Sequence, residues 1–352
     1  MALPELFDAV FIDEGQDLPH SFYRLALASL RDPKRLTWAF DEAQSINRLS
    51  APEAAVVFGR DASGLPNVDL SRRYEGGAQK SLTMRRSYRT PNRVLMAAHA
   101  VNMGLFREGG AVQGMTNREG WEAIGYEVLE GDFTREGQPM RVQRPTGSHA
   151  HPFDADPALL EAALSVAPVI DLYAFTSSER ERTFLAASLK SDLERGFKPE
   201  DLLVVALDDG FASKRFLLAL QTDLGQAGIP AHVVNDSWRV EGSVALSHIY
   251  RAKGNEAARV YACRFEFAHQ AVGGNTDRKT EVQSRNGALV AMTRARFWLT
   301  VSSGGPAPVL EEVRRAAAQY PQLAFESFTQ RTLQRVLEIA DDEPDGQLPL
   351  RF

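Results

Sequence analysis

The sequence has a single cysteine and no long hydrophobic run, and each absence excludes a class of protein. Cys263 has no second cysteine to pair with, so an intrachain disulfide and a four-cysteine zinc site are both excluded. No stretch approaches the ~18 consecutive apolar residues of a membrane-spanning helix, so no membrane partner is expected. The first residues include acids before any cationic stretch, which does not fit a secretory signal. We therefore expect a cytoplasmic protein.

Lysine is also scarce, since 33 of the 40 basic residues are arginine. Arginine suits bidentate contacts with phosphate and carboxylate, although codon bias in a GC-rich genome is the simpler explanation of the excess. The formal net charge is −6. This argues only weakly against a nucleic-acid partner, because the local field at a groove matters more than the total. With 352 residues, 44% of them hydrophobic, the chain is long enough for two globular domains or one large one.

Short apolar segments alternate with amphipathic segments along most of the chain, which predicts a parallel α/β sheet. We expect strands at residues 9–12, 36–40, 81–84, 169–175, 202–207, 231–234, 244–249, 259–265 and 297–302. We expect helices at residues 21–30, 92–105, 158–165, 178–195, 211–227, 287–295 and 307–340. Between about 107 and 156 the pattern breaks into pieces rich in glycine, proline and charge, which predicts an irregular insertion with two or three strands.

The first segment whose residues could take part in catalysis or ligand binding is FIDEGQD, at residues 11–17. An apolar strand ends there in Asp13 and Glu14. Ligands of parallel sheets sit at the carboxyl ends of strands. An aspartate there can hold Mg²⁺, and an adjacent glutamate can orient or deprotonate a water molecule. Acids at this position also cap helices, and Asp17 before Pro19 could do so. Taken alone, this segment leaves both interpretations open.

Four further segments are weak signals when each is considered alone. Residues 36–46 form an apolar strand followed by Asp41 and Gln44, and taken alone this segment is better explained as a strand that ends in a capped turn. Residues 85–93 hold four arginines and could form either a phosphate clamp or a solvated basic face. Residues 248–256 pass from a strand into a turn beside basic side chains, which can hold phosphate. Residues 290–296 place an arginine after an apolar helix, in the tripeptide TRA.

Together, the order and spacing of these five segments resemble the UvrD/Rep-like branch of superfamily 1 DNA helicases. That family carries a DExxD strand, a D-x-x-Q-S-I strand, a Y-R-T/S-P arginine, a K-G-x-E turn and a V-A-x-T-R-A helix, in this order. The resemblance covers residues 9–294. It implies RecA-like P-loop NTPase domains, which are parallel sheets with helices on both faces. The expected parts are the C-terminal part of a first domain at 1–80, a second domain at 81–306 with the insertion at 107–156, and a C-terminal helical tail at 307–352.

The resemblance also implies ATP and Mg²⁺ as cofactors and single-stranded DNA as a partner. Asp13 resembles the Mg²⁺-coordinating acid, and Glu14 resembles the acid that activates the attacking water. Gln44 resembles the sensor of the γ-phosphate. Arg89 and Arg294 resemble two arginines that stabilise charge on the transferred phosphoryl group.

Other residues are assigned by the same resemblance to nucleotide and DNA contacts. Glu256 resembles the residue that contacts the nucleotide ribose, and Gln16 and Gly254 lie beside the nucleotide in the family. The expected contacts with the single strand are His248, Tyr250, Arg251, Lys253 and Thr293.

The sequence departs from the family pattern at several places. Tyr250 stands where the family usually has histidine, and tyrosine can still stack on a base. Residues 47–49, Asn-Arg-Leu, replace the aromatic residues that usually stack on bases there. The large accessory domain that many members insert before the K-G-x-E turn is absent, since only about ten residues separate Val234 from Val244.

The largest departure is the absence of the phosphate-binding loop G-x-x-x-x-G-K-[ST], because no lysine in the chain follows a glycine. Only eight residues precede Ala9, so we expect an incomplete first domain whose strand at 9–12 lacks a neighbour. The expectation is the C-terminal part of an ATP-dependent DNA helicase or translocase that does not hydrolyse ATP alone. A missing N-terminal half or a separate loop-bearing partner chain would supply the loop. The alternative is a non-catalytic helicase-like DNA-binding or adaptor protein, or one half of a split helicase.

Overall fold

The computed structural model describes residues 4–44, 54–207, 210–235, 240–269, 281–330 and 333. The chain separates into two compact units. Among the described residues, the first unit extends to Thr83 and the second unit begins at Met84. Of the helices in these ranges, none combines the length and apolar character needed to cross a membrane.

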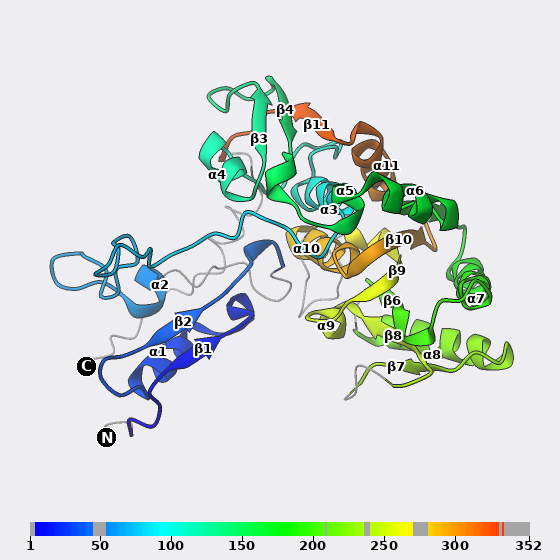
Figure 1. Ribbon diagram of the computed structural model, residues 1–352, viewed down its shortest axis with the longest axis horizontal. Helices are drawn as coiled ribbons and strands as arrows, with labels where there is room; N and C mark the ends of the chain where they lie inside the picture. The colour runs from blue at the N-terminus through cyan, green and yellow to red at the C-terminus, as the bar shows by residue number, and fades with distance from the viewer. Residues whose placement is uncertain are drawn as a thin grey trace. The chain divides into compact units, whose positions relative to one another are not determined.

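The first unit is built on two parallel strands, β1 (Val10–Ile12) and β2 (Leu36–Trp38), drawn in blue in Figure 1. Helix α1 (His20–Ala28) connects them, and α2 (Ala54–Phe58) follows. Short 3₁₀ turns, η1 (Gly15–Asp17) and η2 (Glu42–Gln44), come after the strands. The core of the unit consists of Ile12, Tyr23, Ala26, Val57 and Phe58. The expected strands at 9–12 and 36–40 are therefore present and parallel, although each is shorter than predicted.

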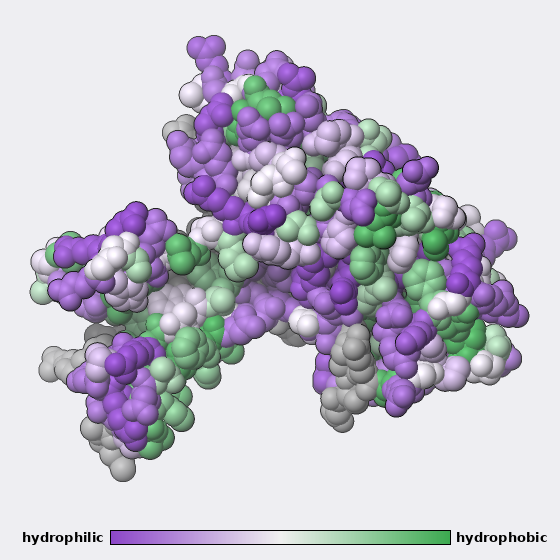
Figure 2. Space-filling model, in the orientation of Figure 1, coloured by the Kyte–Doolittle hydropathy of each residue, from purple (hydrophilic) through white to green (hydrophobic). Residues whose placement is uncertain are grey.

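Strand β1 exposes apolar surface in the first unit. Its central residue, Phe11, is 81% exposed, whereas the next residue, Ile12, is buried. Within the described residues β1 pairs with β2 alone. Figure 2 shows apolar surface over these two strands. Among the described residues, one edge of β1 and the face that carries Phe11 thus lack the cover that parallel strands usually have.

The second unit contains a six-stranded parallel sheet in the order β5-β10-β9-β6-β8-β7. The strands are β5 (Ile170–Ala174), β6 (Leu202–Ala206), β7 (Ala231–Val233), β8 (Val244–His248), β9 (Ala257–Cys263) and β10 (Ala295–Ser303). The helices that flank the sheet are α3 (Asn92–Met103), α7 (Ser178–Glu194), α8 (Gly210–Gln226), α10 (Glu281–Met292) and α11 (Pro308–Gln319). Figure 1 shows α7 and α8 on one face and α3 and α10 on the other. This arrangement confirms the predicted α/β fold class and is consistent with a RecA-like fold.

The main core of the second unit lies between the sheet and helices α7 and α8. Every residue of β6 is buried, which explains the uninterrupted apolar run LLVVA in the sequence. Leu185 and Leu189 of α7 and Leu217 of α8 pack into the same cluster as Val204. The burial of both strand faces fixes β6 as a central strand.

The predicted insertion forms a small antiparallel sheet with a strand from near the C-terminus. Its strands, in the order β11-β4-β3, are β3 (Glu127–Glu130), β4 (Pro139–Gln143) and β11 (Gln322–Glu326). Helix α4 (Arg118–Ala123) packs beside β3, whereas α5 (Pro152–Ala155) and α6 (Pro157–Val166) pack on each other, and α6 accepts a hydrogen bond from Trp298 of β10. Figure 1 shows β3, β4 and β11 together at one end of the second unit.

Strand β11 corrects the prediction of one helical region over residues 307–340. Helix α11 ends at Gln319, and the chain then pairs antiparallel with β4, with Leu323 opposite Val142. Burial alternates along β11, and Phe325 packs its ring 5.4 Å from that of Trp121. The apolar side chains at alternate positions favour a strand once a partner strand is available. Residues 334–340 of the predicted helix lie outside the described residues.

The predicted strand at 81–84 is also wrong. Residues 82–86 have no regular secondary structure and pair with no other strand, and Leu82 and Met84 are both more than three-quarters exposed. The first pairing after them is a single bridge between Ser87 and His149. Alternating side chains indicated a strand here. Among the described residues, however, this segment does not pair with any edge strand of the second unit.

Candidate functional site

In the first unit, the acids that follow β1 and β2 lie at one edge of the sheet. The side chain of Gln16, which is 2% exposed, connects them. Its Nε2 donates to Glu14 Oε2 at 2.6 Å, and its Oε1 accepts from the Asp41 backbone N–H at 2.9 Å. Because β1 and β2 are parallel neighbours, their carboxyl ends meet at the same edge. The structure therefore brings Asp13, Glu14 and Asp41 to adjacent strand ends.

Gln44 reaches the same edge through Asp41. Its Nε2 donates to Asp41 Oδ2 at 2.7 Å, and the Ala43 backbone N–H donates to Asp41 Oδ1 at 3.0 Å. Asp41 thus fixes the turn that carries Gln44. Sequence reasoning gave Asp41 no role, although the spacing D-x-x-Q was the available signal.

A tight backbone bend separates the two acids from the rest of the FIDEGQD segment. Glu14 adopts a left-handed conformation with φ of 51°, and Gly15 follows it. The Tyr23 hydroxyl donates to the Gly15 carbonyl at 2.6 Å, and burial raises the pKa of Tyr23 to about 12, with the charge of Asp17 adding to the effect. A Cβ on Gly15 would lie 2.2 Å from that hydroxyl oxygen. Only glycine therefore permits the close approach of Tyr23.

Asp13, at the end of β1, is an exposed carboxylate whose oxygens can serve as ligands of a metal ion. Its Oδ1 accepts the Glu14 backbone N–H at 2.9 Å. Across the described ranges, no group of three or more His, Cys, Asp or Glu side chains could hold a metal ion. Protein sites that bind Mg²⁺ often supply one or two carboxylates, and phosphate and water oxygens complete the octahedron. Asp13 fits that sparse kind of site and does not fit an all-protein metal centre.

In the second unit, three segments that are far apart in the sequence meet at one ion-pair cluster. Arg89 precedes α3, Glu256 precedes β9, and Arg296 lies at the start of β10. Arg89 Nε is 3.5 Å from Glu256 Oε2, and Arg296 Nε is 3.7 Å from Glu256 Oε1. The three side chains, here called the arginine–glutamate cluster, are 39–50% exposed. Their charges are thus accessible to a dissolved anion.

Hydrogen bonds next to the cluster hold the three segments together. Thr90 Oγ1 donates to the Thr293 carbonyl at 3.3 Å, and both threonines are buried. The Ala257 backbone N–H donates to the Arg294 carbonyl at 3.1 Å. The residue after Arg89 and the residue after Glu256 are therefore both bonded to the segment that joins α10 to β10.

Arg294 is buried in the second unit, with 1% of its surface exposed. Its Nε donates to the Val290 carbonyl at 2.9 Å, and Nη1 donates to the Asn255 carbonyl at 3.4 Å. Thr293 is also buried, and its hydroxyl donates to the Leu289 carbonyl at 2.9 Å. The expected contacts of Arg294 with phosphate and of Thr293 with DNA remain predictions, because both side chains face inward here.

Four of the five expected DNA-contacting residues lie at the end of β8 and on or directly after the short helix α9 (Ile249–Ala252), whereas Thr293 follows α10. The rings of His248 and Tyr250 meet edge to face at 5.9 Å. Tyr250 is 39% exposed, and the exposed Arg251 donates to the Asn235 carbonyl. Burial lowers the pKa of His248, and the charge of Arg251 lowers it further. Tyr250 and Arg251 therefore present a ring and a cation to solvent.

The turn after α9 contains the remaining expected residues. Lys253 is half-buried, and Gly254 has a φ of +79°, which favours glycine. The turn leads directly to Glu256 in the arginine–glutamate cluster. The one member of that cluster to which the sequence assigned no role is Arg296. It lies two residues beyond Arg294, and no local pattern distinguished it from a solvated strand residue.

Comparison with known proteins gives little information about this chain. No family model and no curated protein matches this chain. Among solved structures, the chain is similar to the C-terminal domain of a possible DNA helicase from Lactobacillus plantarum, with 18% identity and a TM-score of 0.33. The match covers 43% of this chain and 83% of that one. This helicase-like similarity is weak, and the functional argument rests on the residues.

Proposed function

We propose that this chain works as part of an ATP-dependent DNA helicase or translocase of superfamily 1. The supporting observation is the arginine–glutamate cluster of the second unit. Arg89 and Glu256 belong to the Y-R-T-P and K-G-x-E segments, and Arg296 directly follows the T-R-A tripeptide; the order of these segments in the sequence resembles that family. Arg89 and Glu256 meet in space although 167 positions separate them in the sequence. Such convergence is expected of residues that act on one ligand.

The strand-end acids of the first unit would contribute the metal chemistry. A bound Mg²⁺ would neutralise charge on the β- and γ-phosphates of ATP. Asp13 would hold that ion through a carboxylate oxygen, and Glu14 would accept a proton from the attacking water. Gln44, held by Asp41, would contact the γ-phosphate. Gln16 keeps Glu14 and Asp41 at a fixed separation.

ATP turnover requires more than these residues, because the sequence lacks a G-x-x-x-x-G-K-[ST] loop. Without backbone amides and a lysine around the β- and γ-phosphates, a nucleotide is poorly positioned for hydrolysis. We therefore propose that a loop-bearing polypeptide, either an N-terminal half or a partner chain, completes the site. On its own, this chain should bind single-stranded DNA but hydrolyse ATP poorly.

DNA binding is the part of this function that the chain can be tested for directly. Fluorescence anisotropy with a labelled oligo-dT would measure affinity over a series of salt concentrations. We expect affinity to fall steeply with salt. Tyr250→Ala should weaken binding roughly 5- to 100-fold, because base–aromatic stacking contributes about 1–3 kcal/mol. Arg314→Gln, on the exposed side of α11, is the matched control and should have no effect.

Affinity that stays constant between low and moderate salt would contradict the proposal. Loss of binding in the Arg314→Gln control as large as in Tyr250→Ala would contradict it too, because binding would then be non-specific.

A second candidate function is a non-catalytic adaptor or DNA-binding protein with a helicase-like fold. The burial of Arg294 among carbonyl groups of its own unit favours this alternative. The two functions differ in the native assembly isolated from the host. DNA-stimulated ATP hydrolysis that Arg89→Ala abolishes supports the helicase, whereas hydrolysis that survives Arg89→Ala supports the adaptor. The mass of the native polypeptide would show in the same preparation whether it carries its own loop.

A further inference from the structure

We propose that Arg89 and Arg296 form a two-arginine clamp for a phosphoryl group, and that Glu256 competes with that group for the two arginines. The inference rests on the proposed function and deepens it. It adds Arg296 as a phosphate-contacting residue and gives Glu256 a role other than a ribose contact.

The geometry of the cluster supports this competition. Each carboxylate oxygen of Glu256 faces a different guanidinium, at 3.5 Å for Arg89 and 3.7 Å for Arg296. The carboxylate therefore bridges the two arginines, as a planar anion would. A phosphoryl group has three peripheral oxygens and more negative charge, and guanidinium groups bind it in the same bidentate manner. A phosphoryl group could thus replace the carboxylate at the same two groups.

Hydrogen bonds hold the chain next to the three side chains, whereas the side chains themselves are half-exposed to solvent. Thr90, next to Arg89, is tied to Thr293, and the Arg296 carbonyl accepts a hydrogen bond from His151 Nε2 at 2.6 Å. The Asn255 carbonyl, next to Glu256, accepts from Arg294. The side chains are 40–50% exposed for the arginines and 39% for Glu256. Charged ends that are open to solvent and carried by well-held backbone suit an exchange of one anion for another.

The electrostatic balance also favours an incoming anion. Two guanidinium groups share one carboxylate, so the cluster keeps a net positive charge. The buried Arg294 donates to the carbonyl of Asn255, the residue before Glu256, and so places a third guanidinium group beside the cluster. Half-exposed ion pairs at 3.5–3.7 Å are weak, so Glu256 is displaced at little cost. An anion with two or more charges therefore binds more strongly than the carboxylate it replaces.

The two roles of Glu256 predict opposite effects of the same substitution. If Glu256 competes with phosphate, Glu256→Gln removes the competing charge and leaves both arginines available. If Glu256 mainly holds the arginines in place, its substitution leaves them less well ordered and weakens the binding of inorganic phosphate.

Isothermal titration calorimetry of the full chain with inorganic tripolyphosphate tests the proposal. We expect Glu256→Gln to bind tripolyphosphate roughly threefold to tenfold more tightly than the unchanged chain, as expected for the loss of two weak ion pairs. Arg296→Gln should weaken binding by a similar factor, and Arg296→Lys should restore part of it. Arg314→Gln, which removes an equally exposed arginine of another ion pair, should leave the affinity unchanged.

Weaker or unchanged binding by Glu256→Gln would overturn the competition, and unchanged binding by Arg296→Gln would overturn the clamp. Glu256→Asp is a second variant in case Glu256→Gln does not fold. Its shorter carboxylate cannot bridge both arginines, so this variant should also bind tripolyphosphate more tightly. Circular dichroism confirms that each variant is folded. Tripolyphosphate contains neither base nor sugar. A negative result with it would therefore not affect the proposed DNA binding, which the Tyr250 variant tests separately.

Discussion

Glu181 is a fully buried carboxyl group near the carboxyl end of β10, with no exposed surface. Its Oε1 accepts from the Arg264 backbone N–H at 2.9 Å and from the Ser302 hydroxyl at 2.7 Å. Its Oε2 is buried without a hydrogen-bond partner. Burial raises the pKa of Glu181 to about 7 despite these bonds, and the nearby charge of Glu266 raises it further. The residue therefore opposes folding when it is ionised.

We predict that Glu181→Gln stabilises the second unit at alkaline pH. A carboxyl group with a folded-state pKa of about 7 and an ordinary value of 4.5 holds its proton more tightly when folded. Its contribution to stability is therefore present below pH 4.5 and is lost as pH rises to about 7. The variant should gain about 3 kcal/mol over the unchanged chain between pH 4 and pH 8. Urea unfolding at both pH values measures this gain. A constant difference would contradict the assigned pKa.

We predict that Gly15→Ala destabilises the first unit by about 1–3 kcal/mol, because the new Cβ would collide with the Tyr23 hydroxyl oxygen. Tyr23→Phe alone should cost about 1 kcal/mol through the lost hydrogen bond to the Gly15 carbonyl. The double variant should lose less than the sum of the two, because the ring carbon Cζ would lie 3.4 Å from the new Cβ. Strictly additive losses in a double-mutant cycle would argue against the close contact.

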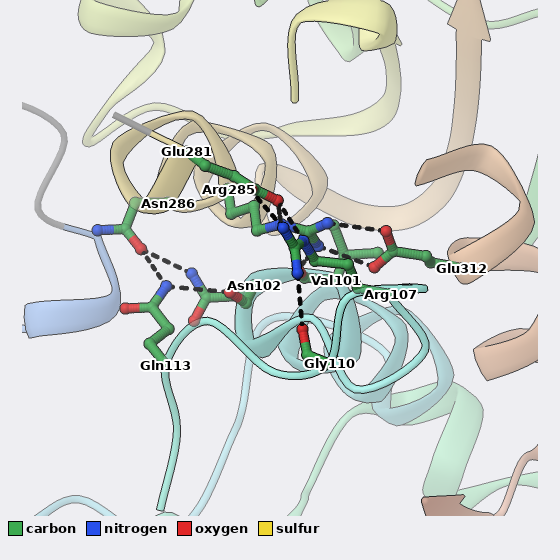
Figure 3. A network of polar contacts seen from close by, with 9 residues as sticks. All are labelled: Val101, Asn102, Arg107, Gly110, Gln113, Glu281, Arg285, Asn286 and Glu312. Carbon is green, nitrogen blue, oxygen red and sulfur yellow. Dashed lines mark hydrogen bonds and ion pairs between the residues drawn. The ribbon is translucent and has the colours of Figure 1, made fainter. Parts of the chain in front are cut away.

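At the scale of elements, a buried polar network joins α3, α10 and α11 (Figure 3). Arg285 of α10, which is 1% exposed, donates from Nη1 and Nη2 to the two oxygens of Glu312 on α11, both at 2.8 Å. Its Nη1 also donates to the Val101 carbonyl of α3 at 2.6 Å. Glu281 bridges Arg285 and Arg107 at 3.0 and 2.8 Å. This network fixes the helices that cover one face of the sheet.

We predict that Glu312→Ala destabilises the second unit by about 3–5 kcal/mol, because it removes the carboxylate that pairs with a buried guanidinium. The adjacent Glu311 pairs with Arg314 at the surface, so Glu311→Ala should cost less than about 1 kcal/mol. The double replacement Arg285→Met with Glu312→Leu should recover most of the loss, because no charge is then buried. Urea denaturation of the four proteins provides the comparison. Equal losses at Glu311 and Glu312 would mean that the network contributes nothing.

Elements with a strong local pattern could be predicted from the sequence, whereas elements that depend on a distant partner could not. The apolar run of β6 and the amphipathic helices α7 and α8 were expected close to where they lie. Strand β11 was missed because its alternating pattern gains stability only when β4, almost two hundred residues earlier, is its neighbour. Residues 81–84 show the converse. They have a strand-like pattern, but among the described residues they pair with no other strand and form none.

At the scale of the whole molecule, the two units have separate hydrophobic cores. We therefore predict two unfolding transitions rather than one. Trp38 lies against the core of the first unit, whereas Trp121 and Trp298 belong to the second. Trp38→Phe should remove the fluorescence change of one transition. Gly15→Ala should shift that transition alone, and Glu312→Ala should shift the other. A single cooperative transition for all probes would contradict this division.

In the candidate site, too, some features follow from the local sequence and others depend on contacts between distant segments. The sequence by itself determined which residue types follow each strand, so Asp13, Glu14 and Gln44 were found at strand ends without coordinates. It also determined the absence of a phosphate-binding loop. Only the tertiary structure decided that Arg296 meets Glu256, and that Arg294 is buried. The physical reason is that the spacing of apolar residues along a sequence determines which side chains share one face of a helix or strand. Packing between distant segments decides which charged groups meet and which are removed from water.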